Sequence, residues 1–311
     1  MLSETEQSIL ATLLYFDFQE FPLTLSEIKK YLFFPGFEKT GSPDLRELEN
    51  MLSGKLSRYV SRVDGFYFLA GREEILKIRA ERYRAAAGKL RRAKFFARLF
   101  APFPFIRAVA LSGSLSLLNS DEGGDIDFFI LTAPGRAWTA RFFLNTFVRL
   151  FGLHPTEKNR RDKICLSFVV DEDNLDLSAF LMPSSENIPD IHYVYWASQF
   201  LPLWGGETFK KFFAANGWIR EYLPNWEPVI SAPEILAAPI FGGRTLQKFF
   251  EKYAGKEKFY KKIQMRILPD EVKKIMNLDT RVVVAGGIIK LHTNDRRAEY
   301  RKKYFAALQK F

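Results

Sequence analysis

The 311-residue chain is predicted to be an α+β protein, and three observations support this class. Helical patterns followed by a β-hairpin signal fill the first 71 residues, buried-strand patterns alternate with helices in the middle, and the last third is mostly helical in pattern. Hydrophobic residues make up 47% and charged residues 26% of the chain, as in ordinary globular proteins. The expected parts are a module over 1–71, a linker helix over 72–100, a core over 101–185 and a C-terminal region over 186–311.

Composition excludes several classes of site. The single Cys165 excludes an internal disulfide and a thiolate zinc site, and three scattered histidines supply a histidine metal site or a hydrolase triad poorly. The first residues lack the basic and apolar segments of a secretory signal, and no apolar run is long enough to span a bilayer. We therefore expect a cytoplasmic protein without a membrane partner.

The N-terminal module is predicted to contain three helices and a hairpin. The first helix covers about 4–16, and Thr24 with Glu27 has the spacing of a capping box that opens a second helix through Leu32. Ser42, which precedes a proline, is expected to cap a third helix over 44–52. Asp64-Gly65 between two alternating apolar runs predicts a two-residue hairpin turn within 59–69.

This order resembles a winged helix-turn-helix domain, a class that commonly binds DNA through its third helix. Here the third helix carries Asp44, Glu47 and Glu49 where DNA phosphates would lie, and the module has ten acidic against seven basic residues. We therefore expect a protein-contact or scaffold module, and sequence-specific DNA binding is not expected.

Basic residues concentrate in two segments. Residues 72–98, within the linker helix, contain ten basic and three acidic residues, and residues 244–311 contain 18 basic and seven acidic residues. Both segments are compatible with an RNA partner, because clustered cations follow a phosphate backbone. Solvated helix faces produce the same counts.

The middle of the chain has the pattern of a chemical site. A buried strand over 106–112 leads into Gly113-Ser114, and after a short helix and a turn a second strand begins at Asp125. Residues two apart share a strand face, so Asp125 and Asp127 point the same way and repel unless a cation lies between them. Such paired carboxylates suit Mg²⁺, and a Gly-Ser turn at a strand end offers N–H groups and a hydroxyl to a phosphate.

Gly113-Ser114, ten intervening residues and Asp125-Ile126-Asp127-Phe128 resemble the signature of the DNA polymerase β-like nucleotidyltransferase superfamily, over about residues 105–180. The resemblance implies a mixed β-sheet with helices and Mg²⁺ (or Mn²⁺) on Asp125 and Asp127. It also implies a nucleoside triphosphate (NTP) held near Gly113, Ser114 and Ser120.

The superfamily usually has a third acid on a later strand. After a helix over about 137–151, the next strand covers 163–170 and places Cys165 and Ser167 where the acid would be. Asp171 shares their parity at the strand end and is the expected third catalytic carboxylate. Asp173, Asp176, a site with two carboxylates and a site that no longer catalyses are the alternatives.

The C-terminal region is predicted to be mostly helical. Helices are expected over 192–201 (ended by Pro202), 244–254, 257–276 and 293–309, and the segment 282–291 is either a hairpin or a helix end. The basic groups of 290–297 either meet a triphosphate or another polyanion, or belong to a helix start capped by Thr293 or Asn294.

Two functions follow. The first is an enzyme that moves a nucleoside monophosphate from an NTP to a hydroxyl acceptor, which is a small molecule, a protein side chain or an RNA end. The second is a regulator or adaptor with a winged-helix module whose nucleotidyltransferase fold binds nucleotide without turnover.

Overall fold

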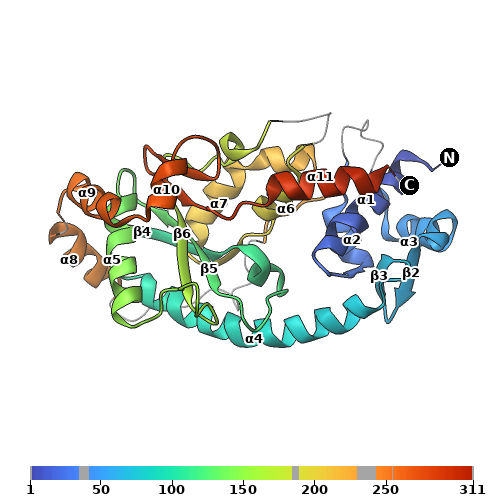
Figure 1. The fold of residues 1–311 in the computed structure, drawn as a ribbon, viewed down its shortest axis with the longest axis horizontal. Coiled ribbons are helices and arrows are strands. Elements are labelled where there is room, and N and C mark those ends of the chain that lie inside the picture. The colour runs from blue at the N-terminus through green and yellow to red at the C-terminus, as the bar shows by residue number, and fades with distance from the viewer. Residues whose placement is uncertain (1, 35–41, 184–188, 230–242, 254, 310–311) are drawn as a thin grey trace.

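The computed structural model describes residues 2–34, 42–183, 189–229, 243–253 and 255–309. A small N-terminal lobe and a larger lobe built on a β-sheet lie at the two ends of the molecule (Figure 1). Helix α4 (Glu74–Phe100) runs from one lobe to the other, as predicted for the linker helix. The chain has the expected α+β class.

The N-terminal lobe contains helices and a small antiparallel sheet. Its main elements are α1 (Glu4–Phe18), β1 (Leu23–Thr24), α2 (Leu25–Tyr31), α3 (Leu45–Ser53), β2 (Val60–Val63) and β3 (Phe66–Leu69). The strand order is β1-β3-β2. Asp64 and Gly65 join β2 to β3 with φ values of 51° and 79°, the left-handed conformations that the predicted two-residue turn requires.

Capping residues set where α2 and α3 begin. Thr24 and Glu27 form the predicted capping box, in which each side chain accepts a hydrogen bond from the other residue's backbone N–H. The prediction that Ser42 caps the next helix is wrong, because Asp44 caps α3 in a second box with Glu47. An aspartate with a glutamate three residues later satisfies two free N–H groups at once, which one serine does not.

The larger lobe is built on a mixed sheet, as expected. Its strands are β4 (Ile106–Leu111), β5 (Ile126–Thr132), β6 (Ile164–Asp171), β7 (Leu201–Trp204), β8 (Val282–Ala285) and β9 (Ile288–Leu291). Their order in the sheet is β7-β4-β5-β6-β9-β8. Strands β5 and β6 are parallel, and the other neighbouring pairs are antiparallel.

Helices cover both faces of this sheet. They are α5 (Ala137–Leu150), α6 (Ile191–Ser198), α7 (Gly206–Ala215), α8 (Gly243–Tyr253), α9 (Glu257–Ile267), α10 (Asp270–Ile275) and α11 (Arg297–Leu308). Phe129 and Phe168 point into a hydrophobic cluster with α6 and α7, whereas Ile130 and Val169 point into a second cluster with α4 and α5. We call these two sides the α6 face and the α5 face.

The N-terminal lobe shares its core with the sheet. Residues of α1 belong to the hydrophobic cluster of the α6 face, and Tyr304 of α11 donates a hydrogen bond to the carbonyl of Ala11 (3.1 Å). The rings of Tyr15 and Tyr195 stack across the same boundary, with centroids 4.1 Å apart. The two lobes are therefore packed into one hydrophobic core.

The C-terminal region differs from its prediction in several elements. The expected helix 192–201 ends at Ser198, and Pro202 lies in edge strand β7, where the missing N–H of proline is tolerated. Pro269 divides the expected helix 257–276 into α9 and α10. Neither Thr293 nor Asn294 caps α11, which begins at Arg297.

The segment 282–291 is a hairpin rather than a helix end. Strand β9 pairs with β6, so the hairpin extends the central sheet, and β7 extends it on the opposite side. The expected boundary at residue 185 therefore divides one sheet rather than two separate structures. Residue 254, the expected end of the helix from 244, lies outside the described residues.

Candidate functional site

The two aspartates of the sequence motif lie together at one end of the central sheet. Asp127 lies in β5 and Asp125 immediately precedes it, and the alternation of a strand turns both carboxylates toward the α6 face. One oxygen of each carboxylate and the Sγ of Cys165 in β6 lie within 4.8 Å of one another. The parallel pairing of Asp127 with Cys165 brings the thiol there.

The Gly-Ser turn lies against this pair. Strand β4 ends at Leu111, and Gly113 begins the short helix η2 (Gly113–Leu117) with a φ of 66°. A Cβ atom at Gly113 would lie 3.2 Å from Oδ2 of Asp127, so only glycine leaves this space free. Ser114 is exposed beside it. Two motif halves that are separated in sequence therefore form one site.

Arg160 neutralises part of the charge on the aspartates. It comes from the loop between α5 and β6, and its Nη2 donates to both oxygens of Asp125, at 2.9 and 3.2 Å. The Asp125 side chain is 10% exposed, whereas that of Arg160 is 59% exposed. The arginine can therefore leave the carboxylate without crossing packed structure. The sequence has Lys158 and Arg161 beside Arg160, but it does not reveal the partner of any of these cations.

Burial and the charge of Asp125 raise the pKa of Asp127 to about 6. The thiol of Cys165 and the charge of Arg160 act in the opposite direction. Burial, followed by the charge of Asp127, raises the pKa of the Cys165 thiol far above its ordinary value, so the sulfur remains protonated. Asp125 and Asp127 thus offer oxygen ligands of the kind that Mg²⁺ prefers, and a neutral thiol adds no charge.

Lys89 of α4 holds the segments that carry Asp125 and Arg160. Its ammonium group donates to the carbonyls of Glu122 and Gly124 and to Oδ1 of Asp162, at 3.1, 2.5 and 3.0 Å. This lysine is not among the site residues that the sequence predicts. The helical spacing could have revealed it: Lys89 lies three residues after buried Ala86 and four before buried Ala93, and is therefore on the buried face of α4.

Asp171 does not join the site. Strand β6 has one residue more than β5 between the Asp127–Cys165 and Phe129–Phe168 pairs. The prediction assumed that Asp171 shares a strand face with Cys165, and this bulge turns Asp171 to the opposite face. Asp171 instead pairs with Thr132, roughly 20 Å of strand away from Cys165.

The Asp171 carboxylate is a structural acceptor. Its oxygens accept from the backbone N–H of Gly135 and Asp173 and from the amide of Asn174, at 2.8, 3.2 and 2.6 Å. It is 1% exposed, and a Cβ at Gly287 would collide with it. The expected alternatives Asp173 and Asp176 follow it at the same distant strand end.

Ser120 is also placed differently from its expected role. It is 1% exposed, and its hydroxyl donates to the carbonyl of Asp121 (3.3 Å), so it shapes the turn before Asp125 instead of facing solvent. A Cβ at Gly124 would lie 3.2 Å from its Oγ. The structure therefore unites Gly113, Ser114 and the two aspartates, and leaves Ser120 beneath them.

Comparisons with known proteins identify no relative, because no family model, curated protein or solved structure matches the chain. Among the described residues, no helix has both the length and the apolar character needed to cross a membrane.

Proposed function

We propose that the protein is a nucleotidyltransferase of the DNA polymerase β-like superfamily, with Mg²⁺ held by Asp125 and Asp127. The supporting observation is that the Gly113 turn lies close to the Asp127 carboxylate, since a Cβ at Gly113 would be 3.2 Å from its Oδ2. A phosphate at this turn would have a metal-binding carboxylate pair directly beside it. Positioning and charge neutralisation are the main requirements of phosphoryl-type transfer.

In this reaction the acceptor hydroxyl oxygen forms a bond to the α-phosphorus of the NTP. The bond from that phosphorus to the α–β bridging oxygen breaks, pyrophosphate leaves with the electron pair, and the hydroxyl proton passes to water. The metal supplies a Lewis acid for the phosphate oxygens. The backbone N–H groups at Gly113 and Ser114 bind and orient the phosphates. The Arg160 side chain can leave Asp125 and bind a phosphate instead.

Nucleotide binding without turnover is the second candidate. Cys165 supports it, because a protonated thiol lies on the strand where the superfamily places a third carboxylate. With only two carboxylates, the metal would take more of its ligands from the phosphates of the NTP. The described cluster also lacks a third carboxylate to accept the hydroxyl proton. The two candidates share their binding site and differ in turnover.

We further propose that the N-terminal lobe is a winged-helix module. Its order of helices and strands, with β1 beside the β2–β3 hairpin, supports this. The acids of α3 support a role in protein contact or scaffolding: Asp44 and Glu47 are exposed at its start, and Glu49 binds Arg62 of β2 (2.8 Å). These groups oppose a DNA phosphate backbone.

The test is calorimetric binding of each of the four common NTPs, with and without Mg²⁺. Asp125→Asn and Asp127→Asn should each weaken Mg²⁺-dependent binding at least tenfold, because each removes a negative ligand. Asp173→Asn is the control, since this exposed carboxylate lies at the far strand end. Equal binding by all four proteins would refute the site.

Turnover distinguishes the two candidates. Pyrophosphate release from the bound NTP is measured with cell extract as the source of acceptor, for the wild type and both aspartate variants. Release that both variants lack supports the transferase. Binding without release supports the regulator.

A further inference from the structure

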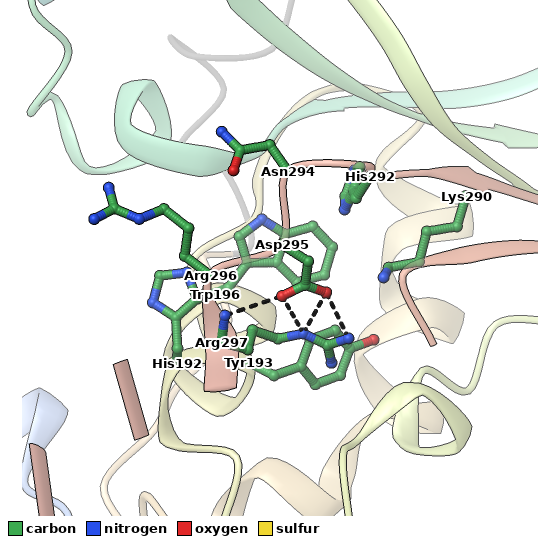
Figure 2. Close-up of a pocket in the computed structure, with 9 residues that line it drawn as sticks. All are labelled: His192, Tyr193, Trp196, Lys290, His292, Asn294, Asp295, Arg296 and Arg297. Atoms are coloured by element: carbon green, nitrogen blue, oxygen red, sulfur yellow. Dashed lines mark hydrogen bonds and ion pairs between the residues drawn. The ribbon is translucent and has the colours of Figure 1, made fainter. Parts of the chain in front are cut away.

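A second cavity lies beyond the end of β9, outside the carboxylate site. Its volume is about 120 Å³, and it is lined by α6 and by the segment 290–297. Figure 2 shows His292, Asn294 and Arg296 around the ring of Trp196. From the sequence alone, it is open whether the basic groups of this segment meet a polyanion.

Several hydrogen-bond donors face this cavity without an acceptor. Within the described residues, no hydrogen bond is formed by the indole N–H of Trp196, the amide of Asn294 or the ring of His292. Lys290 is 1% exposed, and its ammonium group donates to two backbone carbonyls. One of its three protons is therefore left for a ligand.

The carboxylates around the cavity already have partners. Arg297, 5% exposed, binds Asp295 at 2.7 Å and Asp190 at 2.9 Å, and donates further to a carbonyl and a hydroxyl. Glu299 accepts from Arg296 at 3.1 Å. The acidic groups are thus neutralised, while donors remain open, so the cavity favours a ligand that accepts hydrogen bonds and carries negative charge.

Burial is the main cause of the pKa shifts at the cavity, neighbouring positive charge is the second, and the carboxylates of Asp190 and Asp295 oppose it at Lys290. Burial, followed by the charge of Arg297, lowers the pKa of Lys290 to about 8. Burial, followed by the charge of Lys290, lowers the pKa of His292 to about 3, so its ring is neutral at pH 7. A bound anion would offset the repulsion among these groups.

The cavity lies on the same sheet face as the aspartates. The ring of His292 contacts that of Phe168 (5.7 Å between centroids), and Phe168 contacts Phe129, which is two residues from Asp127. Strand β6 separates β5 from β9. Two strand spacings, roughly 10 Å, therefore lie between Asp127 and His292.

We propose that this cavity binds the phosphate or carboxylate group of the acceptor, and so selects a small acceptor that carries a hydroxyl and an oxyanion about 10 Å apart. The proposal rests on the proposed function for its reaction. The anion site itself follows from the free donors of Trp196, Asn294 and Lys290. A cavity of about 120 Å³ has room for one such group.

The experiment follows the Trp196 indole and His292 ring resonances by NMR at pH 7, assigned with Trp196→Phe and His292→Gln. Inorganic phosphate and acetate are titrated separately at constant ionic strength against chloride, without metal or NTP. We expect a saturable shift of both resonances with at least one of the two anions. Asn294→Ala and Lys290→Met should weaken it at least fivefold, and Thr293→Ala, an exposed neighbour outside the lining, should not.

The proposal is overturned if neither anion gives a saturable shift, or if Asn294→Ala binds as the wild type does. Asn294 is exposed, so this variant decides the question even if Lys290→Met fails to fold. Mg²⁺-dependent NTP binding then distinguishes an acceptor anion from the triphosphate of the NTP. The NTP affinity should be unchanged in Asn294→Ala. If the NTP affinity falls together with the phosphate affinity, the cavity binds the triphosphate instead. Failure of the proposed function would appear separately. In that case Asp125→Asn and Asp127→Asn would bind NTP as the wild type does, while the phosphate titration of the cavity would still saturate.

Discussion

The ammonium group of Lys89 lies 3.0 Å from the Oδ1 of Asp162, and at 3% exposure it is almost fully buried. Asp162 lies two residues after Arg160 in the loop before β6. The backbone N–H of Asp162 donates to the carbonyl of Gly124 (3.1 Å). Lys89 also donates to that carbonyl. One side chain of α4 thus joins the loop that carries Arg160 to the turn that carries Asp125.

Lys89→Met should loosen both segments. The apolar stem is kept, but three hydrogen bonds from a charged donor are lost, and we expect the free energy of unfolding to fall by about 2 kcal/mol. Guanidinium denaturation measures this fall, and hydrogen exchange should show faster exchange at the amides of 122–126 and 162–164. Lys77→Met is the matched control, because that lysine is 83% exposed on the same helix. Equal exchange in both variants would show that Lys89 does not hold the turn.

Gly113→Ala should weaken nucleotide binding more than it weakens the fold. The new Cβ costs about 1 kcal/mol for a φ of 66° and also presses on the Asp127 carboxylate. Gly152→Ala isolates the first effect, because Gly152 has a φ of 62° and no atom lies within 4 Å of the position that its Cβ would take. We expect similar losses of stability in thermal melts and a loss of Mg²⁺-dependent NTP affinity, at least tenfold, in Gly113→Ala alone. Equal NTP affinity in the two variants would contradict the phosphate role of this turn.

Local rules predicted the parts of the fold that depend on neighbours in sequence. The Thr24–Glu27 capping box, the Asp64-Gly65 turn and the strands around Gly113 and Asp125 all follow from short-range hydrogen bonding and alternation. The positions of the two aspartates on one strand face needed only the period of two.

Long-range pairing explains the rest. The placement of Asp171 failed because a bulge in β6 is a property of its pairing with β5, which the β6 sequence alone does not encode. The same applies to β7, which becomes a strand by pairing with β4. For 282–291 the hairpin was one of the two predicted alternatives, and pairing of β9 with β6 accompanies it. Arg160 and Lys89 were recognisable as cations, but their partners are distant in sequence.

Arg160→Gln should change metal binding and nucleotide binding in opposite directions. Without the guanidinium, Asp125 no longer has an internal cation, so Mg²⁺ alone should bind more tightly, by roughly 1 kcal/mol for a pair whose arginine is exposed. NTP binding in the presence of Mg²⁺ should weaken, because a phosphate contact is lost. Calorimetry measures both affinities, with Arg161→Gln as the control next in sequence, 65% exposed. A fall in both affinities would mean that Arg160 supports the aspartates rather than competing with the metal.

Stability should depend on pH through His192, which lies between the lobes. Its ring stacks on Tyr300 (4.6 Å) and is hydrogen-bonded to the hydroxyl of Tyr15 (3.1 Å), and burial lowers its pKa to about 4. The unfolded chain, with a histidine pKa near 6.5, binds the additional proton between about pH 4 and 6.5. The contribution of neutral His192 is therefore complete above pH 6.5 and is lost as the pH falls toward 4.

His192→Gln should remove this dependence. Over pH 6 to 4.5 the free energy of unfolding of the wild type should fall more steeply than that of the variant, by about 1.4 kcal/mol per pH unit. His292 remains as a second buried imidazole in both proteins, so the variant retains part of the slope. His154→Gln is the comparison variant: burial also lowers the pKa of this histidine in the loop after α5, but less than that of His192, so its loss should flatten the slope less. Guanidinium denaturation at several pH values measures the slopes, and parallel slopes for the wild type and His192→Gln would show that the imidazole is protonated within the folded protein.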